Sequence, residues 1–147
     1  MSNHAHFLFR SGKFGISTLM KRLLTGYVVS FNKRHRRSGQ LFQNRFKSVI
    51  CQEDTYLKEL VRYIHLNPLR AKIVDTTNRL NWYKYSGHSV LAGRRKSDWQ
   101  DTEYVLSFFG ETKSEAKSVY LKYVRNGIAL GRRPELTGGG FIRSHGG

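Results

Sequence analysis

The first short apolar run of the chain lies close to its N-terminus. Residues 5–9 read Ala-His-Phe-Leu-Phe and predict a buried strand. From Ile16 to Phe31 the apolar positions recur every three or four residues, which predicts an amphipathic helix that ends near Asn32. Apolar and polar residues partly alternate over 45–51, which predicts a second strand.

The next periodic segment begins at Asp54, a good N-cap residue for a second helix. Proline disfavours helical backbone at the residue before it, so this helix should end at or just before Pro68. Its spacing predicts a buried stripe made of Leu57, Leu60, Val61 and Ile64.

The remaining residues have weaker patterns. Residues 75–101 predict a loop anchored by Trp82 and Trp99, and two short helices are expected over 103–109 and 114–124. The tail from residue 132 is glycine-rich and has no period. Strand, helix, strand, helix and then small helices is an order that predicts an α+β fold.

The composition limits the kind of protein. A chain of 147 residues is long enough for one ordinary domain. Its single cysteine excludes a disulfide framework and a cysteine-cluster zinc site. The sequence shows neither a run of 18 apolar residues nor a secretory leader, so we expect a soluble protein of the cytoplasm without a membrane partner.

Charge divides the chain into two parts. The net charge is +16, and residues 1–97 hold 19 Lys or Arg against 4 Asp or Glu. Residues 98–147 hold 7 against 6, so we separate a basic domain over 1–97 from a helical extension with a glycine-rich tail over 98–147. Such a surplus is typical of proteins that bind phosphate, and nucleic acid is the favoured partner. A basic surface that serves solubility alone is the alternative.

Candidate chemistry lies in two places. In a strand, His4 and His6 would present two imidazoles on one face, which can hold a divalent cation, although a chance pair has the same spacing. Tyr63 and Asn67 lie four residues apart on one face of the second helix. A tyrosine can attack a phosphodiester that a metal polarises, and Asn67 could reach the same metal; an interface role for Tyr63 is the alternative. Arg62 and His65 are phosphate contacts at most.

Four blocks of the sequence, in order, resemble a known family. They are residues 3–8 around the histidine pair, the basic segment 39–48, the tyrosine helix with residues 54–57 and 62–71, and residues 82–86, a weaker echo. Together they resemble the single-tyrosine HUH transposases, most closely the REP-associated tyrosine transposase branch.

The resemblance implies a fold and a mechanism. The fold would be a partial ferredoxin-like core that starts at the HUH strand, because only three residues precede His4 where the family has further elements. Tyr63 would be the nucleophile that forms a 5′-phosphotyrosine, and His4, His6 and Asn67 would bind Mg²⁺ or Mn²⁺. The substrate would be single-stranded DNA beside a hairpin, in DNA transposition near the nucleoid. The resemblance also allows a homodimer.

The expected DNA-binding residues are cations of the basic domain. They are Lys21, Arg22, Arg34, Arg36, Arg37, Arg45, Lys47, Arg62 and Arg70. Two alternatives to an active transposase stay open: a non-catalytic DNA-binding relative, and an RNA-binding protein of ribosomal type. The second explains the charge but not the combination of His4, His6, Tyr63 and Asn67.

Overall fold

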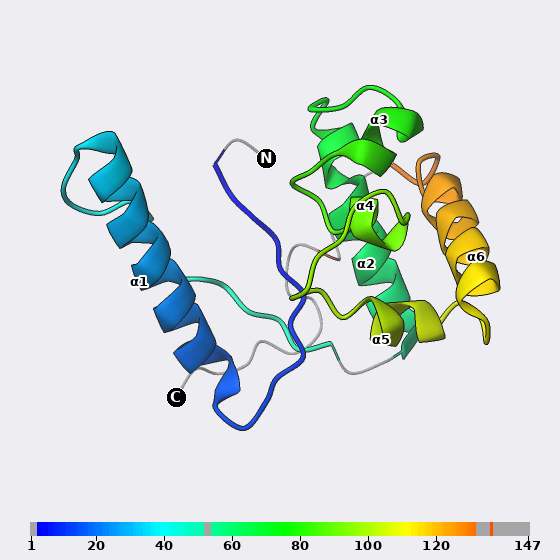
Figure 1. Cartoon of the computed structure of the whole chain (residues 1–147), viewed down its shortest axis with the longest axis horizontal. Helices are drawn as coiled ribbons and strands as arrows, with labels where there is room; N and C mark the ends of the chain where they lie inside the picture. Colours follow the sequence, from blue (N-terminus) through cyan, green and yellow to red (C-terminus); the bar gives the residue numbers. More distant parts are fainter. Residues whose placement is uncertain (1–2, 52–53, 132–135, 137–147) are drawn as a thin grey trace. The chain divides into compact units, whose positions relative to one another are not determined.

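A computed structural model describes residues 3–51, 54–131 and 136. The chain separates into two compact units (Figure 1). We call Leu8–Val49 the basic unit, and Met1–Phe7 together with Ile50–Gly147 the helical unit.

The described residues contain helices and no strand, so the predicted α+β class and its ferredoxin-like core are wrong. Residues 5–9 and 45–51, the two predicted strands, have neither helical nor strand structure. A strand exists only where its backbone groups pair with those of a second strand. Alternating apolar residues describe a strand's faces and cannot supply that partner. A sheet of two strands alone would in any case be marginal.

The basic unit contains one helix, α1, over Gly15–His35. It ends where Arg36 adopts a left-handed conformation with φ of 48° and its backbone N–H bonds to the carbonyl of Asn32. Met20 is the one buried residue of this unit, all of which the structure describes, and Phe14 is 85% exposed. The predicted helix is therefore confirmed, but most of its apolar side is exposed.

The helical unit contains the remaining helices (Figure 1). They are α2 (Asp54–Arg70), α3 (Thr77–Trp82), α4 (His88–Leu91), α5 (Thr102–Ser107) and α6 (Lys113–Asn126). Side-chain oxygens of Thr76, Asp101 and Thr112 accept backbone N–H groups and cap the N-termini of α3, α5 and α6. Helix α2 packs against α3 and α6, so the tyrosine helix lies within the core of this unit.

Several predictions for this unit can now be compared with the structure. The helices over 103–109 and 114–124 are confirmed as α5 and α6. The predicted loop over 75–101 is wrong where α3 and α4 lie. Each of these helices is so short that its few apolar residues show no helical period in the sequence. Trp82 and Trp99 are not anchors, since they are 55% and 80% exposed.

Helix α2 also continues past Pro68 to Arg70. Pro68 has no N–H to donate to the carbonyl of Ile64, so one helical bond is missing in the last turn. The helix ends two residues later, and the Pro68 carbonyl accepts the N–H of Ile73 at 2.9 Å.

The core of the helical unit is built around α2. Its most buried large side chains, among the residues that the structure describes, are Leu66, Leu80, Leu91, Tyr120, His88 and Ser89. Within the predicted α2 stripe, Val61 is buried, whereas Leu57, Leu60 and Ile64 are partly buried. His65, Leu66 and Asn67 are buried as well, so the buried face is broader than the apolar spacing predicts. Among the described residues, no helix is long and apolar enough to cross a membrane.

Candidate active site

The structure brings the predicted histidine pair to the predicted nucleophile. The ring centroids of His4 and His6 lie 5.2 Å apart, and those of His6 and Tyr63 lie 5.8 Å apart, both in edge-on arrangements. All three residues belong to the helical unit. The segment that carries the histidines is not a strand, yet it places His6 beside half-buried Tyr63 and His4 beside His6.

The structure defines the surroundings of both imidazoles. The Nδ1–H of His4 donates to the side-chain oxygen of Asn3 at 2.7 Å, which leaves the lone pair on Nε2. Burial, together with the neighbouring His4, lowers the pKa of His6 below its ordinary value. A neutral imidazole is the form that binds a metal ion.

Asn67 lies one turn beyond Tyr63 on α2. It is 6% exposed, and its side-chain nitrogen has no hydrogen-bond partner among the described residues. A buried amide without a partner is costly, so a ligand that satisfied it would be favoured.

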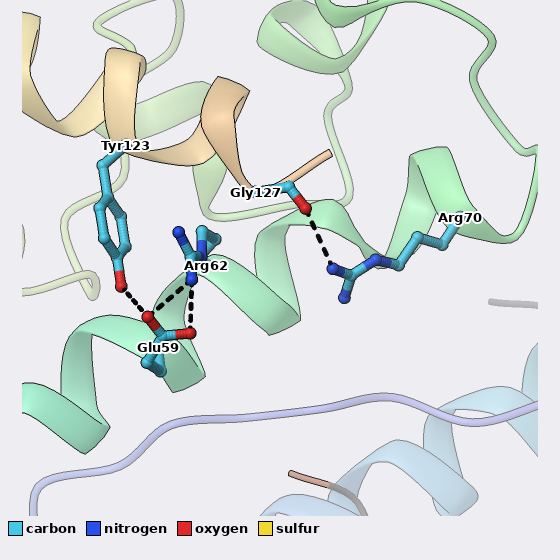
Figure 2. Close-up of polar contacts among 5 residues, drawn as sticks. All are labelled: Glu59, Arg62, Arg70, Tyr123 and Gly127. Carbon is cyan, nitrogen blue, oxygen red and sulfur yellow. Dashed lines mark hydrogen bonds and ion pairs between the residues drawn. The ribbon is translucent and has the colours of Figure 1, made fainter. Parts of the chain in front are cut away.

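Arg70 fixes the other side of the tyrosine. Its guanidinium carbon lies 5.6 Å from the centroid of the Tyr63 ring, and its Nη2 donates to the carbonyl of Gly127 at 3.4 Å (Figure 2). A predicted DNA-binding cation thus lies beside the predicted nucleophile and is tied to the end of α6.

Arg62, by contrast, is held inside the protein. It is 8% exposed, and its Nη2 donates to both carboxylate oxygens of Glu59 at 2.6 Å (Figure 2). The Tyr123 hydroxyl also donates to Glu59 at 2.6 Å, and the Arg62 guanidinium carbon lies 4.2 Å from the Tyr123 ring centroid. Gly127 is required here, because a Cβ would overlap the Arg62 side chain. In this arrangement Arg62 joins α2 to α6.

The other predicted DNA-binding cations lie in the basic unit and are all exposed. Lys21 and Arg22 lie on α1 beside Thr18 and Thr25 and line a shallow groove with them. Arg34 lies in the last turn of α1. The remaining four follow in order along the chain after α1: Arg36, Arg37, Arg45 and Lys47.

Sequence reasoning missed a buried polar chain behind the tyrosine helix. The Nε2–H of His88 donates to the side-chain oxygen of Asn81 at 2.8 Å, so its Nδ1 accepts the Tyr120 hydroxyl at 2.6 Å. The Tyr120 oxygen then accepts the Nδ1–H of His65 at 2.8 Å. Burial lowers the pKa of His65 to about 3 and that of His88 to about 4, and it raises the pKa of Tyr120.

This chain of hydrogen bonds joins α2, α6, α4 and α3. His65 therefore faces the core, although it lies only two residues from Tyr63. No local pattern could have revealed the pairing, because 55 residues separate His65 from Tyr120.

Comparison with known proteins supports a class for this chain. The particular similarity is to a family described as IS200-like transposases, whose model matches residues 1–67. The matched range contains His4, His6, Tyr63 and Asn67. No curated protein and no solved structure matches the chain.

Proposed function

We propose that this chain nicks and rejoins single-stranded DNA through Tyr63, as a transposase of the REP-associated tyrosine branch. The observation that carries the proposal is the approach of His6 to Tyr63, at 5.8 Å between ring centroids. The family match supports it, because a transposase must break and remake phosphodiester bonds.

The reaction balances without an outside reactant. The Tyr63 oxygen attacks the phosphorus, the bond from phosphorus to the 3′-oxygen breaks, and the 3′-oxygen leaves as a hydroxyl. The Tyr63 phenol loses one proton and the leaving 3′-oxygen gains one, so protons balance. The DNA strand is then held as a 5′-phosphotyrosine, and attack by another 3′-hydroxyl restores a phosphodiester and releases Tyr63.

The residues present fit a divalent metal ion. His4 and His6 lie side by side, with 5.2 Å between their ring centroids, and the side-chain oxygen of Asn67 would be a third ligand. The Asn67 nitrogen that lacks a partner is a donor, so it would serve a phosphate oxygen and not the metal ion. The described residues contain no cluster of three or more His, Cys, Asp or Glu, so phosphate oxygens and water would fill the other positions. A bound Mg²⁺ or Mn²⁺ would stabilise negative charge on the phosphate.

The remaining roles belong to side chains of this protein. Arg70 would hold the Tyr63 ring in place by its position over the ring face. The exposed cations of the basic unit, which contains ten Lys or Arg and no Asp or Glu, would bind the phosphates of a hairpin next to the cleavage site.

The decisive experiment uses hairpin DNA with a single-stranded flank, labelled at either end and incubated with Mn²⁺ or EDTA. We expect a covalent adduct on the downstream fragment with Mn²⁺, resolved on a denaturing gel. Tyr63→Phe should abolish the adduct and leave DNA affinity within about twofold, because it removes only the attacking oxygen. Tyr56→Phe, on the same helix, is the matched control and should retain the adduct.

The histidine pair needs its own variants. His6→Ala should abolish Mn²⁺-dependent cleavage, whereas His35→Ala in the basic unit should leave it intact. An adduct that persists in Tyr63→Phe would show that Tyr63 is not the nucleophile. DNA that shifts on a native gel but is never cut would favour the non-catalytic binding module instead.

A further inference from the structure

A pocket on the helical unit lies outside the residues that match the transposase family. It has a volume of about 400 Å³ and is formed by α3 and the loop that follows it, with one residue from the segment after α4. Its main lining side chains are Arg79, Trp82, Tyr83, Lys84, Tyr85 and Arg95. The proposed active site uses none of them.

The pocket presents aromatic rings to solvent. Trp82 is 55% exposed and Tyr85 is 74% exposed. The guanidinium carbon of Arg94 lies 5.3 Å from the Trp82 ring centroid, yet Arg94 does not line the pocket. Arg94 can cover only one face of the indole, and the Lys84 ammonium nitrogen likewise lies 4.7 Å from the centroid of the Tyr85 ring. Each ring keeps a second face on which a planar ligand could stack.

The rings stand on a rigid base. Tyr83 packs against the hydrophobic core, between the two exposed rings in the sequence. Asn81, next to Trp82, is held by the buried His88 at 2.8 Å, and the Thr76 side chain caps α3. A preorganised aromatic surface loses little entropy when a ligand stacks on it.

The charge of the pocket selects an anion. Arg79, Lys84 and Arg95 line it, and no acidic residue does. Asp75 pairs with Arg79 at 3.2 Å, but both groups are largely exposed, and such a pair is weak. Flat rings between cations are the combination that binds bases and phosphates of unpaired nucleic acid. An acidic polypeptide would use the charges and leave the rings without a stacking partner.

We propose that this pocket binds an unpaired base of single-stranded DNA, stacked on Trp82 and Tyr85, with the adjoining phosphates on Arg79, Lys84 and Arg95. The choice of DNA as the ligand rests on the proposed function. The site itself needs neither Tyr63 nor a metal, so it can be tested without cleavage.

The chain offers a matched pair of fluorescent reporters, because it has two tryptophans and both are exposed. In a Tyr63→Phe background with EDTA, Trp99→Phe leaves Trp82 as the sole reporter, and Trp82→Phe leaves Trp99. Titration with a ten-nucleotide thymidine strand should quench Trp82 to saturation and leave Trp99 unchanged. An abasic strand of equal length and charge should not quench Trp82.

Affinity gives a second measurement. Trp82→Ala should weaken binding of the thymidine strand about tenfold, in the middle of the range for one base stacked on an aromatic ring. Trp99→Ala should change it less than twofold. Arg95→Gln should reduce the salt dependence of binding by about one phosphate contact.

Three results would overturn the proposal: equal quenching by the abasic strand, an equal response from Trp99, or quenching by polyglutamate, which would indicate an acidic polypeptide. The two proposals fail separately. Quenching of Trp82 in a protein that never forms an adduct would remove the nicking reaction and keep the pocket. An adduct formed without quenching of Trp82 would keep the nicking reaction and remove the pocket as a DNA site.

Discussion

The two units of this protein use their aromatic and apolar residues in opposite ways. In the helical unit, ten buried residues form one hydrophobic cluster, and even two histidines are enclosed beside Tyr120. In the basic unit Met20 alone is buried, while Phe14, Tyr27 and Val29 are each more than half exposed. Helices thus form in both units, but the helical unit buries far more apolar surface than the basic unit.

This difference assigns different work to the two units. Substitutions of buried residues in the helical unit should change stability, because they act on packed and desolvated groups. Substitutions of cations in the basic unit should change DNA binding and leave stability nearly unaltered.

Acid should destabilise the helical unit through its buried histidines. The pKa of His65 is about 3 and that of His88 about 4 in the folded protein, against about 6.5 when unfolded. The unfolded chain therefore binds protons more readily, and the stabilising contribution is complete above pH 6.5 and is lost as the pH falls. Between pH 7 and pH 5 we expect the free energy of unfolding to drop by about 4 kcal/mol, measured by urea titration.

Single variants separate this effect from general charge repulsion. His88→Phe removes one of the two groups and should reduce the drop to about 2 kcal/mol. His35→Gln, in the basic unit, should leave the drop unchanged. An equal drop in His88→Phe would contradict the assignment to the buried pair.

Truncation of an apolar side chain should distinguish the units directly. Leu66 is fully buried, so Leu66→Ala should lower the free energy of unfolding by about 3 kcal/mol through lost contacts and a cavity. Leu23 on α1 is 40% exposed, and Leu23→Ala should cost less than about 1 kcal/mol. Urea titration of both variants at pH 7 measures the contrast, and similar losses would show that α1 also depends on packing.

Removal of the buried Tyr120 hydroxyl should lower the free energy of unfolding by a smaller amount. Tyr120→Phe keeps the ring but leaves His65 and His88 without their shared partner, at a cost of about 2 kcal/mol. The comparison is Tyr104→Phe on α5, which should cost less than about 0.5 kcal/mol because this tyrosine is exposed. Thermal unfolding of the two variants checks this, and a neutral Tyr120→Phe would mean that water replaces the hydroxyl.

Neutralising cations of the basic unit should change DNA binding and leave stability unaltered. The double variant Arg36→Gln, Arg37→Gln should weaken binding of single-stranded DNA. The slope of the logarithm of the binding constant against the logarithm of the salt concentration should fall in magnitude by about 1.4, because two fewer phosphates are neutralised and fewer counterions are released on binding. Stability should change by less than about 0.5 kcal/mol. Lys113→Gln with Lys122→Gln, exposed on α6, removes the same charge from the helical unit and should leave the salt slope unaltered. Equal slopes for the two double variants would place the DNA elsewhere.

Part of the candidate site was predictable because its signals are local. The spacing of His4 and His6, and that of Tyr63 and Asn67, follows from their positions along short segments. Their predicted roles remain proposals, but the proximity of His6 to Tyr63 is now a feature of the structure. The pocket around Trp82 was not predictable, because the same residues could equally have been buried anchors.

Four of the helices and the distribution of charge follow from the sequence alone. Periodicity and capping act over three or four residues, which is why α1, α2, α5 and α6 could be recognised without knowledge of their neighbours. The tertiary structure alone decided that residues 5–9 and 45–51 form no strand, that Arg62 pairs with Glu59, and that His65 and His88 share Tyr120. A strand needs a partner, and burial depends on which distant segment covers a side chain, so neither can be read from local spacing.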